Sequence, residues 1–128
     1  MLILLDTHAL LWWWKDDPRL SARAIAAIED EANTVLVSAA SAWEIATKHR
    51  LGKLPGVEDG IRQFHELVIA DGFTHLAVTH QHALKTGAFE IEHRDPFDRM
   101  LAAQALVEGA TLLTVDPEMQ QFPVTCVW

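Results

Sequence analysis

The chain has 128 residues, of which 50% are hydrophobic and 22% charged, so it is expected to be one folded domain, 1–128, and not a disordered protein. No apolar run is long enough for a membrane span, and the apolar N-terminus, interrupted at Asp6 and lacking a basic flank, is no signal peptide. The lone Cys126 excludes an internal disulfide and favours a cytoplasmic protein. The net charge of −8 argues against a broad basic nucleic-acid surface, but it suits a carboxylate-rich metal site or a basic partner.

The first half of the chain alternates apolar runs with helical patterns. In chain order it predicts a strand over 2–5, helices over 7–14 and 21–31, a strand over 34–38 and a helix over 41–51. The first helix is stopped by residues 15–18, which end in proline. Ser21 can cap the second helix, and Gly52 suits a left-handed cap at the end of the third.

The second half continues the alternation, and no internal repeat or linker interrupts it. In chain order it predicts a helix over 57–70, a weaker strand over 74–78, a helix over 79–87, a polar loop over 90–94, a long helix over 96–108, a strand over 111–115 and an edge strand over 124–128. Near-continuous apolar strands alternating with helices are typical of an α/β fold. We therefore expect a mainly parallel sheet of four to five strands with helices on both faces.

Five acidic residues fall where strands end or helices begin. Asp6 follows the first strand, Glu44 lies in the first turn of the helix after the second, Asp95 and Asp98 flank the start of the long helix, and Asp116 follows a later strand. Sites in such sheets form beyond the carboxyl ends of the strands, so these residues should share one rim. Carboxylates gathered there would repel one another unless cations lay between them. Oxygen donors without clustered Cys or His favour Mg²⁺ or Mn²⁺ over Zn²⁺.

Most of these acids also have a purely structural explanation. Residues 41–44 match a capping box, Asp95 and Asp116 each precede a proline as N-caps, and Asp98 suits the positive end of the helix dipole. Asp6 differs, because an acid directly after a buried strand need not cap anything. Capping does not require all of these acids to share one rim, so the set as a whole favours a metal site.

Three consecutive tryptophans, Trp12–Trp14, cannot all enter one core, because consecutive helical residues point about 100° apart. Two arrangements are open. Either at least one is exposed or anchors a dimer or partner interface, or the three wrap across two neighbouring packing surfaces. Among the histidines, His80 and His82 are expected at the surface and not as metal ligands, whereas His8 is a weaker candidate for facing the acidic rim.

Four segments, taken in order, resemble the signature blocks of PIN-domain proteins, and among them the VapC-type toxins of bacterial toxin–antitoxin pairs. The segments are LLDTHALLW at 4–12, SAASAWEIA at 38–46, DPFDRMLAA at 95–103 and LLTVD at 112–116. They run from near the first residue almost to the last, so the resemblance covers essentially the whole chain.

The resemblance implies a three-layer α/β/α sandwich and Mg²⁺-dependent endoribonuclease activity, with Mn²⁺ as a substitute. It also implies an RNA substrate, inhibition by a cognate VapB-like antitoxin, and a homodimer. Asp6, Glu44, Asp98 and Asp116 match the acidic quartet of the family, and Asp95, one helical turn before Asp98, shares or takes its role.

Supporting roles follow from the same match and from position. Ser38 and Thr114 match places where the family has a small hydroxyl residue that orients the acids. Arg94 and Arg99, beside the acids, are candidates for contacting phosphate. The basic residues 48, 50 and 53 either touch RNA or simply complement the end of their helix.

Phosphodiester hydrolysis needs an activated water and stabilisation of charge on the phosphoryl and leaving oxygens. Carboxylate-held magnesium supplies both without a Ser or Cys nucleophile. In our hypothesis Asp6 and Asp98 hold a first ion, and Glu44 and Asp116 complete the site or hold water.

Three other functions would each require particular residues. A phosphoryl-transfer enzyme of the haloacid dehalogenase type needs a second Asp where this chain has His8. A response-regulator receiver needs adjacent acids after the first strand and a late strand-end Lys, neither of which is present. An inactive PIN-like domain that only binds RNA or a partner protein stays open, and metal-dependent cleavage of RNA would separate it from the enzyme.

Overall fold

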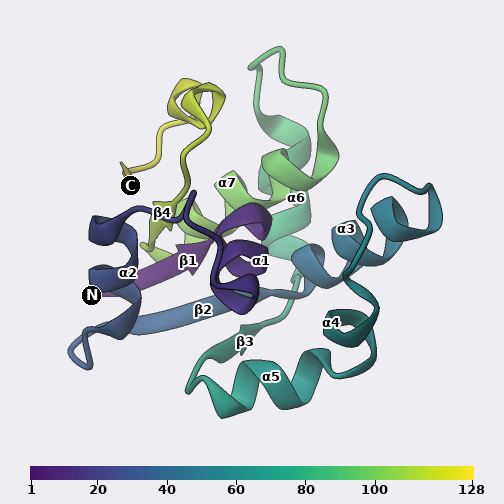
Figure 1. Cartoon of the computed structure of the whole chain (residues 1–128). Helices are drawn as coiled ribbons and strands as arrows, with labels where there is room; N and C mark the ends of the chain where they lie inside the picture. Colours follow the sequence, from purple (N-terminus) through teal and green to yellow (C-terminus); the bar gives the residue numbers. More distant parts are fainter.

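One parallel sheet organises the chain in the computed structural model, which describes residues 1–128 (Figure 1). Its strands are β1 (Leu2–Leu5), β2 (Thr34–Ser38), β3 (Thr74–Leu76), β4 (Thr111–Leu113) and β5 (Cys126–Val127). Their order across the sheet is β3-β2-β1-β4-β5, and every neighbouring pair is parallel. The predicted α/β class and the sheet of four to five mainly parallel strands are confirmed.

Seven α-helices and one 3₁₀-helix connect the strands. They are α1 (Thr7–Lys15), α2 (Ala22–Glu29), α3 (Ala39–Arg50), α4 (Glu58–Arg62), α5 (Phe64–Ala70), α6 (His80–Ala88), α7 (Pro96–Glu108) and the 3₁₀-helix η1 (Pro117–Gln121). None of the helices has both the length and the hydropathy needed to cross a membrane.

Two separate hydrophobic cores make the sandwich three-layered. Along β1, Ile3 and Leu5 join a core with α1, α2 and α5, whereas Leu4 between them joins a second core with α7. The same alternation continues in β2, because successive strand residues point to opposite faces. Each face of the sheet therefore needs its own cover of helices, as an α/β/α sandwich provides.

Side-chain caps fix where several helices begin. Ser21 accepts a hydrogen bond from the Ala24 amide at the start of α2, as predicted. At the C-terminal end of α7, Gly109 adopts φ 67° and its amide donates to carbonyls of the last turn, so the predicted end of this helix at residue 108 is confirmed. These local signals explain why most helix boundaries were predictable to within one or two residues.

Two predicted helices differ from those observed. The segment predicted as one helix over 57–70 is two, because the backbone leaves the helical conformation at Gln63 (φ −111°, ψ 25°). The Trp14 ring lies against Gly60 of α4 and meets Phe64 of α5 edge-on at 5.5 Å between centroids. The helix predicted from Ser41 begins earlier, at Ala39.

The position of β1 in the sheet determines where the candidate site lies. It lies between β2 and β4, so chain segments leaving these three strands emerge at one edge of the sheet. Asp6 follows β1, Ser38 leads directly into α3, and Thr114 follows β4.

Candidate active site

Asp6 is a buried carboxylate that the fold orients at both oxygens. Its Oδ1 accepts the His8 amide at 3.0 Å and so caps α1, while its Oδ2 accepts the Thr114 hydroxyl at 2.6 Å. The position of Asp6 after a buried strand did not require a cap, but the structure shows that Asp6 is one. Burial raises the pKa of Asp6, and the neighbouring Glu44 raises it further, against the hydrogen bonds that lower it.

Glu44 is 3% exposed, on the inner side of α3. Its Oε2 pairs with the Lys48 ammonium one turn later, and its buried Oε1 has no hydrogen-bond partner. The capping box proposed for residues 41–44 does not form, because Ser38 caps α3 and Ser41 lies inside the helix. Glu44 therefore has no part in capping, and one of its oxygens is left free.

Asp98 lies in the first turn of α7 and contacts His93 from the preceding loop. The Asp98 Oδ2 is 2.9 Å from His93 Nε2, and the other ring nitrogen of His93 is 3.6 Å from a Glu118 carboxylate oxygen. Burial raises the pKa of Asp98 to about 6 despite the His93 hydrogen bond. The charges of Asp95, Asp6 and Glu44 also raise it, so these acids influence one another electrostatically.

Asp95 and Asp116 are N-caps, as their prolines predicted. Asp95 Oδ1 accepts the amides of Phe97 and Asp98 at the start of α7, and Asp116 Oδ1 accepts the Glu118 amide at the start of η1. Each cap uses one carboxylate oxygen and leaves Oδ2 outside it. Capping and ligand binding are therefore compatible at both residues.

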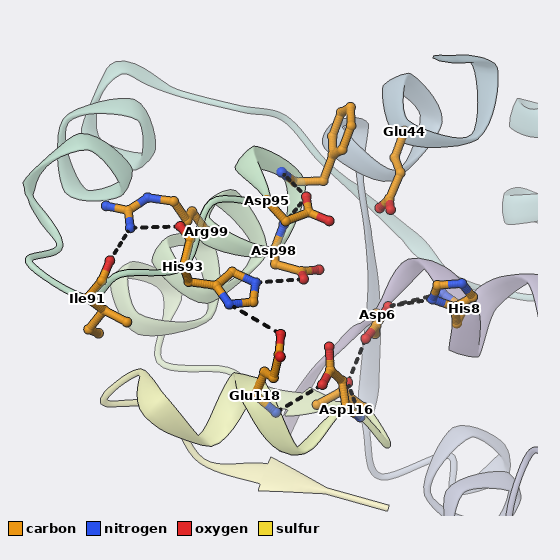
Figure 2. A network of polar contacts seen from close by, with 12 residues as sticks. Asp6, His8, Glu44, Ile91, His93, Asp95, Asp98, Arg99, Asp116 and Glu118 are labelled. Carbon is orange, nitrogen blue, oxygen red and sulfur yellow. Dashed lines mark hydrogen bonds and ion pairs between the residues drawn. The ribbon is translucent and has the colours of Figure 1, made fainter. Parts of the chain in front are cut away.

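The five acids face one cavity of about 520 Å³ whose lining contains no hydrophobic residue. Figure 2 shows the carboxyl groups of Asp6, Glu44, Asp95, Asp98 and Asp116 arranged around a common space. His8, Lys48, His93, Arg94, Glu118 and others complete the lining. The structure thus brings together every acid predicted for the rim, and His8 faces it too.

This cavity fits a hard divalent cation by the chemistry of its donors. The free atoms are carboxylate oxygens, including the buried and unpartnered Oε1 of Glu44. Raised pKa values at Asp6 and Asp98 show that nearby positive charge only partly offsets the burial and crowding of the acids. No three His, Cys, Asp or Glu side chains form a ready-made cage, so the donors surround an open space.

A second layer of polar contacts holds the acid-bearing elements. Ser38, predicted to orient the acids, touches none of them. It caps α3 by accepting the Ala40 amide and donates to the buried Gln104 of α7, which joins the helices that carry Glu44 and Asp98. Thr114, the other predicted hydroxyl, contacts Asp6 directly.

Arg99 does not serve the predicted phosphate-contacting role. Its guanidinium donates to the backbone carbonyls of Thr86, Phe89, Ile91 and His93, and so ties the loop before α7 to that helix. A guanidinium with this many fixed acceptors is committed to structure. Its contribution to the site is indirect, through the placement of His93.

The two histidines predicted at the surface differ: His80 is exposed, but the prediction for His82 was wrong. His82 is buried: its Nδ1 accepts the Thr79 amide and its Nε2 lies 3.8 Å from Glu108. Of the two arrangements left open for Trp12–Trp14, the second is observed, and none of the three is fully exposed. Trp12 packs on Trp128, Trp13 on Phe73 and Trp14 on Phe64, which is the arrangement that spans neighbouring surfaces.

Sequence reasoning missed His93 and undervalued Lys48. The spacing of four residues from Glu44 to Lys48 on a helix was an available signal for their ion pair. His93 gave no signal, because it lies in an irregular loop whose path is fixed by Arg99.

Comparisons with known proteins identify the family of this chain. A model of the PIN domain family matches residues 3–124. Ribonuclease VapC22 of Mycobacterium tuberculosis is 32% identical, and the match covers 98% of both chains. Ribonuclease VapC16 of the same organism is 44% identical over 69 residues, a match that spans only about half of that protein, 49%.

Solved structures agree on the fold. VapBC2 from Rickettsia felis, bound to a DNA fragment from its promoter, superposes with a TM-score of 0.72 at 15% identity, covering 99% of this chain and 98% of that one. VapBC-1 from nontypeable Haemophilus influenzae gives 0.67 at 20% identity, covering 99% and 97%. The chain therefore belongs to the PIN-domain family, and its curated relatives there are VapC proteins.

Proposed function

We propose that this chain is a metal-dependent endoribonuclease, the toxin of a VapBC-type toxin–antitoxin pair. The observation that carries the proposal is the convergence of five carboxylates on one fully polar cavity, with a buried Glu44 oxygen left unpartnered. The names of its relatives, ribonucleases VapC16 and VapC22, support RNA as the substrate.

In this proposal Asp6 and Asp98 hold a first Mg²⁺ or Mn²⁺, and Glu44 and Asp116 complete the site or position water. Asp95 adds its uncapped oxygen beside Asp98. The metal would supply an activated water and would stabilise negative charge on the phosphoryl group.

The protein's own residues have distinct tasks. Thr114 and the His8 amide fix Asp6, so that its oxygens need no reorganisation when a cation binds. The Nε2 atom of His93 contacts the Asp98 carboxylate and so fixes its orientation. Lys48 neutralises part of the acidic charge, and the exposed Arg94 on the cavity wall is suited to attract the phosphate backbone.

An antitoxin and a second copy of the chain are the proposed protein partners. The antitoxin is supported by the structural neighbours, which include VapBC and FitAB complexes. A homodimer is a prediction from the family resemblance. Size-exclusion chromatography with light scattering tests it, since a dimer has twice the mass of 14.3 kDa.

The function is tested by incubating the purified chain with total RNA in Mg²⁺, Mn²⁺ or EDTA. We expect cleavage with either metal, none with EDTA, and none with Asp6→Asn. Asp17→Asn is the matched control, because Asp17 pairs with Arg19 away from the acidic cavity. Cleavage that persists in EDTA, or in Asp6→Asn, would contradict the mechanism; binding without cleavage would favour an inactive PIN-like domain.

A further inference from the structure

Trp43 is the one exposed tryptophan or phenylalanine side chain of the molecule. It is 62% exposed, whereas every other Trp and Phe is buried or partly buried. It directly precedes Glu44 in α3 and does not itself line the acidic cavity.

The ring is also held in a fixed place. Trp43 packs against Phe97 in a T-shaped contact, with 4.8 Å between ring centroids. Phe97 is nearly buried, and its amide donates to Asp95 at 2.9 Å in the cap of α7. The indole is thus attached to the turn that positions Asp95 and Asp98, and its orientation relative to the acids is set by packing.

The lining of the acidic cavity contains no Trp, Tyr or Phe, and its only rings are the imidazoles of His8 and His93, of which His93 is buried against Asp98. The chain also carries a net charge of −8, so a broad electrostatic attraction for RNA is not available there. Proteins that bind single-stranded nucleic acid gain affinity by stacking bases on aromatic rings. An exposed aromatic ring outside the cavity would add this contact to those made within it.

The surroundings of Trp43 suit a base better than a protein partner. On the same face of α3 follow Ala46, Thr47 and Arg50, at the spacing of successive helical turns. The one large apolar residue that follows along this row is the exposed Leu51, two helical turns from Trp43, with the small or polar Ala46 and Thr47 between them. Arg50 is exposed about 10 Å along the helix axis from Trp43 and can meet a backbone phosphate.

We propose that Trp43 is a stacking platform for a nucleobase of single-stranded RNA next to the phosphate held in the acidic cavity. The inference rests on the ribonuclease function proposed above and names a subsite for its substrate. Trp43 is a positioning residue in this account. It holds the RNA strand while the acids act on the phosphate.

Binding is measured in an Asp6→Asn background, so that the RNA is not cut, using a randomised ten-nucleotide RNA pool. An abasic ribose-phosphate decamer has the same charge without bases. Trp43→Leu should weaken binding of the pool roughly 5- to 100-fold, as expected for one lost stacking contact, and should leave binding of the abasic decamer unchanged. Trp43→Phe should restore most of the affinity, and Leu84→Ala, an exposed apolar control on α6, should change neither.

Cleavage by the otherwise unaltered chain gives a second readout. Trp43→Leu should raise KM and leave kcat nearly unchanged, because stacking away from the reacting phosphate acts equally on ground and transition states. Equal affinity of Trp43→Leu and its parent for the pool would overturn the inference while leaving the ribonuclease function standing. So would a change in oligomeric state without a change in RNA affinity. If the parent neither binds nor cuts RNA, both proposals fail.

Discussion

Aspartates in two regions of the molecule behave in opposite ways. Around the tryptophan cluster, Asp71 accepts both indole N–H groups of Trp13 and Trp14 at 3.1 Å, and the nearby Asp17 is bound by Arg19. In the acidic cavity, Asp98 is buried among like charges. The Arg19 hydrogen bonds lower the pKa of Asp17 to about 2, whereas burial raises the pKa of Asp98 to about 6.

The difference separates structural acids from acids available to bind a cation. An aspartate with its donors in place is stabilised in the charged form and has little to offer a ligand. An aspartate whose charged form is disfavoured by burial and by neighbouring negative charges is stabilised most by a bound cation. The number of acidic residues does not by itself identify the site. The site is identified by carboxylates whose negative charge is only partly neutralised by their neighbours.

The largest expected contrast is in activity. Asp6→Asn should reduce RNA cleavage at least about 10³-fold, because it removes a charged donor to the metal while leaving an oxygen for Thr114. Asp71→Asn should keep activity but lower the free energy of unfolding by about 1 kcal/mol, through weaker indole hydrogen bonds. Cleavage rates and urea unfolding of both variants check this. Comparable losses of activity in Asp6→Asn and Asp71→Asn would contradict the difference between the two regions.

Substitution of Lys48 tests how much of the negative charge in the acidic cavity this side chain neutralises. Lys48→Met leaves the buried Glu44 without its cationic partner, so the metal-free protein should lose about 1–3 kcal/mol of stability. Added Mg²⁺ should then stabilise the variant more than the parent, because it supplies the missing charge. Thermal unfolding with and without Mg²⁺ measures the difference, and an equal shift in both proteins would argue that Lys48 and the metal do not share a site.

The pH dependence of stability should have opposite signs in the two regions. The folded pKa of Asp98, about 6, lies above its ordinary value of 3.8, so its ionisation opposes folding as the pH rises from about 4 through 6. Without metal, Asp98→Asn should therefore stabilise the protein at pH 7, by on the order of 1–2 kcal/mol after solvent screening, and have little effect near pH 4.

Asp17 is the matched control. Its pKa is lowered to about 2, so its charge contributes stability above pH 4, and this contribution is lost as the pH falls toward 2. Asp17→Asn should slightly destabilise the protein at pH 7. Urea unfolding across this pH range compares the pair, and the same sign for both substitutions would contradict the account.

Much of the fold was predictable because its signals are local. The apolar runs at 2–5 and 34–38, the cap at Ser21 and the stop at Gly109 depend on neighbours in sequence. The break at Gln63 was not predictable from local signals, since no glycine or proline marks it, and the Trp14 ring that packs against both α4 and α5 is distant in sequence.

The candidate site likewise has a part that was predictable from the sequence and a part that was not. The acids could be placed on one rim because parallel strands and helix starts dictate it. The free oxygen of Glu44, the His93 contact and the structural use of Arg99 depend on side-chain packing between separate elements. Arg99 shows the limit most clearly, because proximity to the acids in sequence suggested phosphate binding where the fold uses it for backbone carbonyls.

Direct metal binding tests the central claim, that these acids form a divalent-cation site. Isothermal titration of the chain with Mn²⁺ and Mg²⁺ should give saturable binding that is lost in Asp6→Asn combined with Asp98→Asn and retained in Asp17→Asn. Absence of binding in the parent, or binding that survives the double substitution, would contradict the account.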